Sequence, residues 1–349
     1  MKCTIQNIAD HLGLSRNTVS KALKNSSEVS ENTRNLVIKT ASKLGYKNAT
    51  FATPVIPASE TGSNGTILFL TRTYASDSEF WTTVLRGIES ILSNANYHLA
   101  ISIMSDSDLK QLNFPQTISD SPIKGLILVE ICDKVVCDAL SQFNLPIVSV
   151  DMPNVPFEEL NGIDVVTMES KKNLKKIINQ LIEKGAESFG FVGDLYSPNV
   201  SRGFQERYNA LSECLAEHQL PLNQKNCLLH QTPEDFRNFQ TTVNNLQAMI
   251  SLPDVFICGN DWTAIQLIYA LQFLGFQIPK DICVVGFDNI PAASRISPSL
   301  TTISTPQKYL GIAAARQILE RIQHPNCPHV FCQYETELII RNSTNIISF

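Results

Sequence analysis

A group of side chains suited to reading DNA lies close to the N-terminus: Arg16, Asn17, Thr18, Ser20 and Lys21. Base edges in the major groove are recognised by forked or short hydrogen-bonding side chains, with Arg or Lys for guanine, Asn for adenine and the Thr methyl for thymine. On the exposed face of one helix these residues would form a base-reading surface. The alternative is the ordinary solvated face of a small helical bundle.

Three short helices between residues 4 and 45 are expected to position this group. Thr4 can cap the first helix and Gly13 can end it. Ser15 can cap the second helix and Ser30 the third. Apolar residues at helical spacing are expected to face inward: Ile5, Ile8, Ala9 and Leu12, then Val19, Ala22 and Leu23, then Leu36, Val37, Ala41 and Leu44. Two helices joined by a tight turn and closed by a third form a helix-turn-helix.

The net charge of −5 is unevenly distributed along the 349 residues. Residues 1–50 carry 8 Lys and Arg against 3 Asp and Glu, a net charge of +5, so the remainder carries −10. A basic segment has the sign needed to contact phosphates, and an acidic one repels them. DNA contacts are therefore expected to be confined to the N-terminal segment.

Beyond residue 65, apolar strand-like runs alternate with helical patterns. The expected strands are 66–70, 99–103, 125–129, 147–150, 190–192, 255–258 and 283–287. The expected helices include 81–92, 174–183, 205–216 and 264–274. Such alternation predicts an α/β fold of parallel sheets covered by helices on both faces. In such folds ligands bind at the carboxyl ends of the strands.

The sequence contains none of the common cofactor or nucleophile motifs. No G-x-G-x-x-G opens a helix, and neither a Walker-type phosphate loop nor a G-x-S-x-G elbow occurs. No cofactor and no enzymatic activity are therefore expected, although the carboxylate pair of a hydrolase would leave no such signature. Four residues could ligate zinc: His324, Cys327, His329 and Cys332. Pro325 and Pro328 interrupt them and their spacing fits no common zinc finger, so a surface loop without metal is expected.

A cytoplasmic location is expected. The N-terminus lacks the apolar run of a signal peptide, and no stretch reaches the roughly 18 apolar residues of a membrane span. The nine cysteines are scattered, and several lie inside apolar runs. That distribution suits buried, reduced thiols.

The N-terminal segment resembles the DNA-binding headpiece of the lactose-repressor (LacI/GalR-type) family. The resemblance rests on TIQNIADHLGLSRNTVSKAL at 4–23, VSENTR at 29–34 and LGY at 44–46. It implies a homodimer whose two headpieces read a pseudo-palindromic operator in double-stranded DNA. The implied DNA contacts are Thr4, Ser15, Arg16, Asn17, Thr18, Ser20, Lys21 and Asn25.

The resemblance continues through PDVFICGND at 253–261, LGFQIPKDICVVGFD at 274–288, PSLTTI at 298–303 and LIIRNST at 338–344. It implies a headpiece (1–47), a linker (48–65) and a core (66–345) of the type I periplasmic-binding-protein kind. The core would have two lobes joined by three crossings. One lobe would comprise about 66–161 plus 291–323, and the other about 162–290 plus 324–345.

The same resemblance implies a site for a small effector between the lobes. Its residues would be Phe80, Trp81, Asp151, Arg207, Asn260 and Asp288. Carboxylates, an amide and a guanidinium can bind the hydroxyls of a sugar while aromatic rings cover its apolar face. Each has a structural alternative: the aspartates could cap turns, Arg207 could form a surface ion pair, and the aromatics could belong to the core.

The linker departs from the family pattern. The family usually has Tyr-x-Pro-Asn followed by a helix whose leucine enters the minor groove. Here Tyr46 is followed by Lys47 and Asn48, and Pro54 falls inside the would-be helix with Val55 near the leucine position. We therefore expect an extended tether in place of a wedging helix.

The sequence as a whole indicates an effector-responsive DNA-binding regulator of the repressor kind, with a sugar-like effector. The alternative is a solute-binding sensor of the same two-lobed shape without a regulatory role on DNA.

Overall fold

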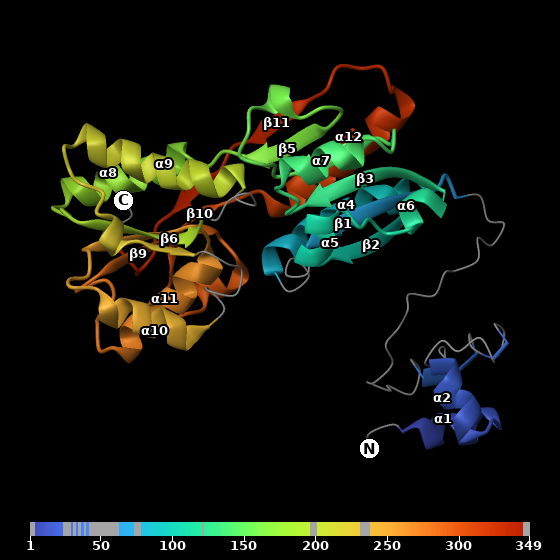
Figure 1. The fold of residues 1–349 in the computed structure, drawn as a ribbon. Helices are drawn as coiled ribbons and strands as arrows, with labels where there is room; N and C mark the ends of the chain where they lie inside the picture. Colours follow the sequence, from blue (N-terminus) through green and yellow to red (C-terminus); the bar gives the residue numbers. More distant parts are fainter. Residues whose placement is uncertain are drawn as a thin grey trace. The chain divides into compact units, whose positions relative to one another are not determined.

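The computed structural model describes residues 4–23, 29–30, 33, 36–37, 40–41, 63–72, 78–120, 122–195, 201–230 and 238–344. The chain divides into two compact units, residues 1–62, which include the headpiece, and 63–349, which include the core (Figure 1). Within the described ranges, no helix has the length and apolar character needed to cross a membrane. The linker positions Pro54 and Val55 lie outside these ranges.

The headpiece contains α1 (Ile5–Leu12) and α2 (Arg16–Leu23), and their caps confirm the predicted boundaries. Thr4 and Asn7 form a capping box at the start of α1, which ends at Gly13 with φ of +63°. A left-handed residue at a helix end is accessible to glycine without a Cβ clash. The Ser15 hydroxyl accepts a 3.0 Å hydrogen bond from the Thr18 amide, so Ser15 caps α2 as expected.

The apolar core of the headpiece joins α1 and α2 to the chain that follows. The buried residues are Ile8, Ala9, Val19, Ala22, Val29, Val37 and Ala41. Leu36 leaves 50% of its surface exposed, so its predicted inward orientation was wrong. Val37 and Ala41 lie four residues apart, so both face the apolar core on the same side of the helix. Leu36 is adjacent to Val37 in sequence, so its side chain points about 100° away from that buried side. Leu44 lies outside the described residues.

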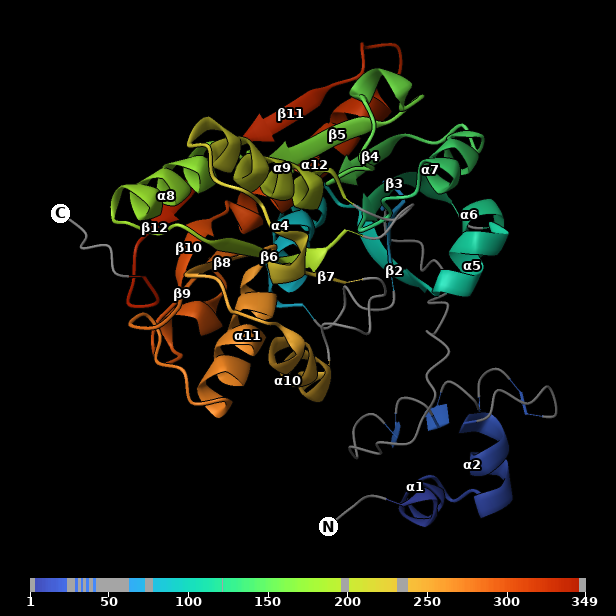
Figure 2. The same cartoon turned by 60° about the vertical axis from the view of Figure 1, so that its left-hand side comes forward.

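The core contains two six-stranded sheets of matching design (Figure 2). The first has the order β11-β5-β4-β3-β1-β2 and the second the order β12-β10-β9-β8-β6-β7. All pairs are parallel except β10 with β12, which confirms the predicted parallel sheets. The strands of the first sheet are β1 (Thr66–Arg72), β2 (His98–Met104), β3 (Ile123–Val129), β4 (Ile147–Val150), β5 (Asp164–Met168) and β11 (Phe331–Tyr334). Those of the second are β6 (Phe189–Asp194), β7 (Leu228–His230), β8 (Val255–Cys258), β9 (Cys283–Asp288), β10 (Thr301–Ser304) and β12 (Glu337–Ile339).

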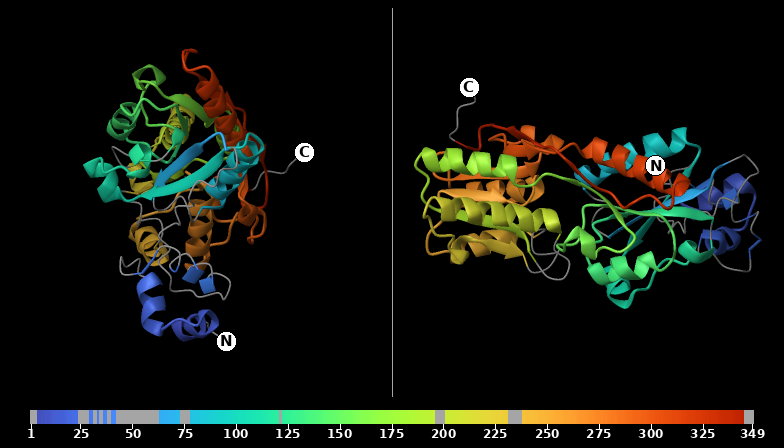
Figure 3. Two further views of the ribbon diagram at one scale, coloured as in Figure 1. Left: turned by 90° about the vertical axis from the view of Figure 1, so that its right-hand side faces the viewer. Right: turned by 90° about the horizontal axis from the view of Figure 1, so that it is seen from above.

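Helices cover both faces of each sheet, so the central strands are buried (Figure 1). The helices packed on the first sheet are α4 (Glu79–Asn94), α5 (Asp106–Gln111), α6 (Thr117–Asp120), α7 (Lys134–Ser141) and α12 (Gln307–Gln323). Those on the second are α8 (Lys172–Glu183), α9 (Arg202–Glu217), α10 (Phe239–Ala248) and α11 (Asp261–Phe273). Each sheet with its helices forms one lobe, and Figure 3 (right) shows the two lobes side by side.

Two glycines allow α4 and α12 to pack closely against each other. A Cβ on Gly87 would collide with the backbone carbonyl of Lys308, and one on Gly311 would collide with that of Val84. The glycines therefore permit backbone-to-backbone contact between the two helices, which cover one face of the first sheet.

The chain crosses between the lobes at three short connections: Glu169–Lys171, Thr305–Pro306 and Glu335–Thr336. The predicted crossings near residues 162, 291 and 324 were therefore misplaced. Strand β5 pairs with β4 in the first sheet, and β10 pairs with β9 in the second. The first lobe thus gains β5 and β11 and loses β10 relative to the predicted division. Each strand belongs to the lobe whose sheet it is hydrogen-bonded to, so strand pairing determines where one lobe ends and the other begins.

Candidate functional site

The exposed side of α2 presents the residues expected to read DNA. Arg16 and Asn17, in its first turn, are exposed, and Thr18, Ser20 and Lys21 are half-buried. Val19 and Ala22 hold the opposite side of the helix against α1. Thr4 and Ser15 are exposed, and both use their hydroxyl oxygens as helix caps. Asn25 lies outside the described residues. The helix therefore has one packed face and one polar face whose N-terminal residues are the most exposed, the geometry that major-groove reading requires.

Arg207 on α9 lies at the carboxyl ends of the strands in the second sheet. Its side chain is only 3% exposed, and its Nη1 donates a 2.8 Å hydrogen bond to the Gly259 carbonyl after β8. The guanidinium lies over the ring of Phe287 on β9, with 3.7 Å from its central carbon to the ring centroid. This excludes the surface ion pair considered as the alternative. Within the described residues, Nε of Arg207 has no hydrogen-bond acceptor.

Three carboxylates end strands in an unusual backbone conformation. Glu130 follows β3, Asp151 follows β4 and Asp288 ends β9, with φ of +56°, +68° and +115°. Side chains other than glycine rarely adopt such angles, and residues held in them concentrate at functional sites. A fourth carboxylate, Asp194, ends β6. We call Glu130, Asp151, Asp194, Arg207 and Asp288 the strand-end cluster.

Members of the strand-end cluster from different lobes act on one another electrostatically. Burial lowers the pKa of Arg207, and the charges of Asp288 and Asp151 oppose that shift. Burial raises the pKa of Asp151 and of Asp288, and the Arg207 charge lowers both. Asp151 belongs to the first lobe, whereas Arg207 and Asp288 belong to the second. The predicted residues Asp151, Arg207 and Asp288 thus lie in one electrostatic network that spans the two lobes.

Asn260 and Asp261 hold the ends of β8 and β9 in place. The side-chain oxygen Oδ1 of Asn260 accepts a 2.9 Å hydrogen bond from the Thr263 amide and so caps α11. Asp261 is fully buried and accepts from the Thr302 hydroxyl at 2.5 Å and the Ile290 amide at 2.9 Å. Burial raises the pKa of Asp261 to about 7. These bonds fix the turn that carries Asp288.

The predicted aromatic pair is buried at the start of α4. Phe80 and Trp81 are 5% and 8% exposed, and their rings meet edge to face. Phe80 belongs to the apolar core. Trp81 turns its indole Nε1 toward Glu130 and donates a 2.6 Å hydrogen bond to that carboxylate. Trp81 therefore connects the core to the strand-end cluster, and Phe80 supports it.

Sequence reasoning missed Glu130 and Asp194. Glu130 directly follows the expected strand 125–129, as Asp151 follows 147–150, and Asp194 lies two residues after the expected strand 190–192. Listing every polar residue within two positions after each expected strand would have found both. They were passed over because no resemblance marked them.

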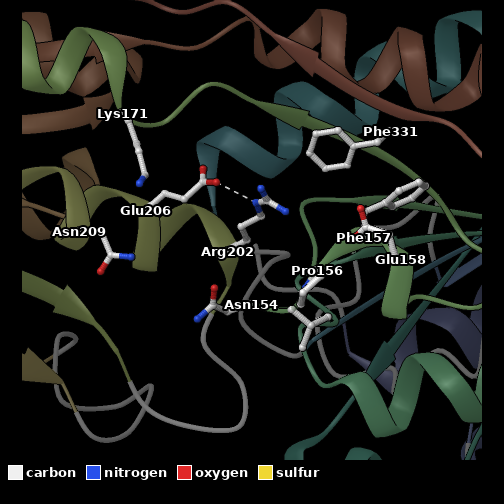
Figure 4. Close-up of a pocket in the computed structure, with 10 residues that line it drawn as sticks. Asn154, Pro156, Phe157, Glu158, Lys171, Arg202, Glu206, Asn209 and Phe331 are labelled. Carbon is white, nitrogen blue, oxygen red and sulfur yellow. Dashed lines mark hydrogen bonds and ion pairs between the residues drawn. The ribbon is translucent and has the colours of Figure 1, made fainter.

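A separate groove is lined by residues of both lobes (Figure 4). Its volume is about 680 Å³, and Phe157 and Phe331 face Arg202 and Glu206 across it. Two of its lining cations are paired, Arg202 with Glu206 at 2.8 Å and Lys171 with Glu213 at 3.0 Å, and Glu158 also lines it. None of the predicted effector residues lines this groove in the described part of the chain. Because both cations are already paired, the groove is a weaker candidate for the effector site than the strand-end cluster.

Of the residues considered for zinc, His324, Cys327 and His329 lie in the loop after α12, and Cys332 lies in β11. His329 lies 3.2 Å from the Asp164 carboxylate, which also receives two hydrogen bonds from Arg321. Cys327 is exposed. Across the described ranges, no three His, Cys, Asp or Glu side chains gather as a metal site would require.

The fold and the two sites define a class: a small helix-turn-helix unit joined to a two-lobed, periplasmic-binding-protein-like core. Two family models match the chain. Residues 4–48 match "Bacterial regulatory proteins, lacI family", and residues 178–344 match "Periplasmic binding protein-like domain". The chain therefore combines a LacI-family helix-turn-helix domain with a periplasmic-binding-protein-like domain.

Similar proteins support this assignment over nearly the whole chain. The ribose operon repressor of Haemophilus influenzae is 27% identical, covering 97% of this chain and 98% of the relative. The transcriptional repressor PurR of Photobacterium profundum is 26% identical with the same coverage. The lac repressor dimer, solved bound to operator and the anti-inducer ONPF, has a TM-score of 0.66 at 20% identity and covers 99% of each chain.

Proposed function

We propose that this protein is an effector-responsive, sequence-specific transcriptional repressor that acts in the cytoplasm and catalyses no reaction. The headpiece (1–47) would bind operator DNA, the segment 48–65 would tether it, and the strand-end cluster would bind a small polar effector of the sugar class. The relatives named above support the repressor role. A solute-binding sensor without a role on DNA has no use for the headpiece.

The exposed start of α2 carries this proposal. Arg16 and Asn17 stand exposed at the start of the helix, while Val19 is fully buried beneath them. Arg and Asn form bidentate hydrogen bonds with guanine and adenine in the major groove. A solute-binding protein would gain nothing from presenting this pair on a separate basic unit.

We further propose that the protein acts as a homodimer, because an operator with two half-sites requires two headpieces. The core offers apolar side chains that a second copy could cover. Ile101 and Ile103 on the edge strand β2 are 50% and 48% exposed, and Trp262, Tyr269 and Phe273 are exposed along α11. The lac repressor, a structural relative, is a dimer on its operator.

The effector is expected to act by preferring one arrangement of the lobes. Asp151 lies in one lobe and Arg207 and Asp288 in the other, so a ligand that touches both lobes binds each arrangement with a different affinity. A coupling of about 1–3 kcal/mol would change operator affinity by roughly 5–150-fold.

The test is selection of operator DNA from a random duplex library by the full-length protein, followed by binding measurements on the selected sequence. We expect a pseudo-palindrome bound by a dimer. Binding without sequence preference, or the absence of DNA binding at low salt, would contradict the proposal. Analytical ultracentrifugation reports the dimer independently.

A further inference from the structure

The strand-end cluster contains more negative than positive charge. Four carboxylates, Glu130, Asp151, Asp194 and Asp288, accompany one guanidinium, that of Arg207. A second guanidinium, Arg72 at the end of β1, acts on Glu130 but forms a 2.6 Å ion pair with Asp106. If all the carboxyls are ionised, the site keeps a net negative charge.

The cluster also has a buried donor ready for a ligand. Arg207 is only 3% exposed, and its Nε finds no acceptor among the described residues although Nη1 is bonded to Gly259. A buried donor left unbonded costs free energy, so a ligand oxygen that accepts from it would be favoured. Glu130, Asp194 and Asp288 are only half-buried, so solvent can reach them. One donor and several acceptors suit a ligand that accepts once and donates several times.

We propose that the strand-end cluster binds an effector that carries a protonated amino group together with hydroxyls, as an amino sugar or an aminopolyol does, and that Glu130 selects for the amino group. This inference rests on the proposed function and specifies its effector. An ammonium group supplies three donors and a positive charge to a site with an excess of carboxylates. A phosphorylated or carboxylated sugar would add like charge beside four acids, which is unfavourable in a partly buried site.

Glu130 is the residue best placed to make this selection. It is anchored by the Trp81 indole at 2.6 Å, which leaves its other oxygen for a ligand. Burial raises the pKa of Glu130, and the charges of Asp194 and Asp151 raise it further. Burial and neighbouring acids, among them Asp151 and Glu130, likewise raise the pKa of Asp288. A bound cation would relieve this repulsion, and an anion would increase it.

The experiment uses the full-length dimer and a panel in which each sugar is present in neutral, 2-amino and phosphorylated form, with glucose, glucosamine and glucose 6-phosphate as the first set. Thermal shift identifies binders, and isothermal titration gives their affinities. We expect binding by amino forms, weaker binding by neutral forms and none by phosphorylated forms. Phosphorylated or neutral forms that bind as tightly as amino forms, or amino forms that never bind, overturn the proposal.

Two substitutions test the role of Glu130. Glu130→Gln keeps an oxygen for Trp81 and removes the charge, so we expect the affinity for the amino form to fall about tenfold, which corresponds to about 1.4 kcal/mol. The neutral form should change by less than about twofold. The matched control is Glu183→Gln at an exposed position near the end of α8. Equal losses for amino and neutral forms would mean that Glu130 only positions Trp81, and would overturn the selective role.

Operator binding, measured on the same preparations, separates this inference from the proposed function. Retained operator binding with release by a neutral or anionic effector rejects only the amino-group inference. Failure to bind any DNA sequence selectively rejects the proposed function itself.

Discussion

The Arg207 guanidinium lies over the ring of Phe287, with its central carbon 3.7 Å from the ring centroid, while Nη1 donates a hydrogen bond to the Gly259 carbonyl. Both contacts come from the ends of neighbouring strands, β8 and β9. The ring and the carbonyl therefore fix the guanidinium in one plane at the strand-end cluster. Arginine stacked in this way cannot be replaced by lysine without loss.

Replacing Arg207 by Ala is expected to abolish the effector response while leaving operator affinity unchanged, because the headpiece folds around its own core. The change also leaves Asp151 and Asp288 without their cation. The measurement is operator affinity with and without effector, beside Arg295→Ala at an exposed position as the control. A retained response would place the effector site elsewhere.

Replacing Asn17 by Ala is expected to weaken binding to the selected operator by about 1–3 kcal/mol and to relax the preference at one base pair. Asn17 is exposed in the first turn of α2, so the headpiece should keep its stability. Gel-shift titrations on the operator and on its single-base variants check this. The control is Asn161→Ala, at an exposed position on the two-lobed part of the chain. If Asn17→Ala leaves sequence specificity unchanged, α2 is not the helix that reads the operator.

Replacing Gly311 by Ala is expected to destabilise the core by several kcal/mol, since the added methyl group would meet the Val84 carbonyl. Backbone atoms cannot move aside as a flexible side chain can. Urea unfolding followed by circular dichroism measures the change. Ser93→Thr adds a methyl group at an exposed position of α4 and should be nearly neutral. A stable Gly311→Ala protein would show that α4 and α12 can separate at little cost.

Asp261 is expected to make the stability of the core depend on pH. Its pKa is about 7 in the folded protein against 3.8 ordinarily, so the folded state holds the proton more tightly than the unfolded state. The free energy of unfolding should therefore fall as pH rises from about 4 to about 7, by an amount on the order of a few kcal/mol, and level off above that.

The variant Asp261→Asn removes this titration and should flatten the dependence between those pH values. Its amide oxygen can still accept a hydrogen bond from Thr302 or Ile290, which limits the structural loss. Chemical unfolding at a series of pH values provides the comparison. A pH profile identical to that of the unchanged protein would assign the dependence to another group.

Local sequence rules predicted the headpiece and the central strands well. The caps at Thr4 and Ser15 were predicted from their hydroxyl chemistry, and the structure confirms both. Continuous apolar runs also located the buried strands, among them β4 and β8, whose predicted bounds agree with those observed. In these segments one pattern within the sequence decides the structure.

The division into lobes was harder to predict because it depends on partners distant in sequence. Strand β5 begins with the charged residue Asp164, which is almost fully buried and paired with Arg321 from α12, 157 residues later. From sequence alone, a charged residue beside an apolar run predicts that the buried strand does not include it, because an unpaired buried charge is costly and its partner is not known. The edge strands β11 and β12 are short and half-exposed, so they carry no strong apolar signal. Glu130 was missed for a related reason, since only the fold brings it beside Asp151 and Asp194.

One of the two-residue crossings between the lobes limits how they can move. Strand β11 is hydrogen-bonded in the first sheet and β12 in the second, with only Glu335 and Thr336 between them. Two residues offer four soft backbone dihedral angles. The lobes can therefore swivel about this point but cannot slide apart, and effector binding is restricted to a rotation with few degrees of freedom. Lengthening this connection would leave the lobes joined at Glu169–Lys171 and Thr305–Pro306, so we expect it to widen the range of the rotation without altering either lobe.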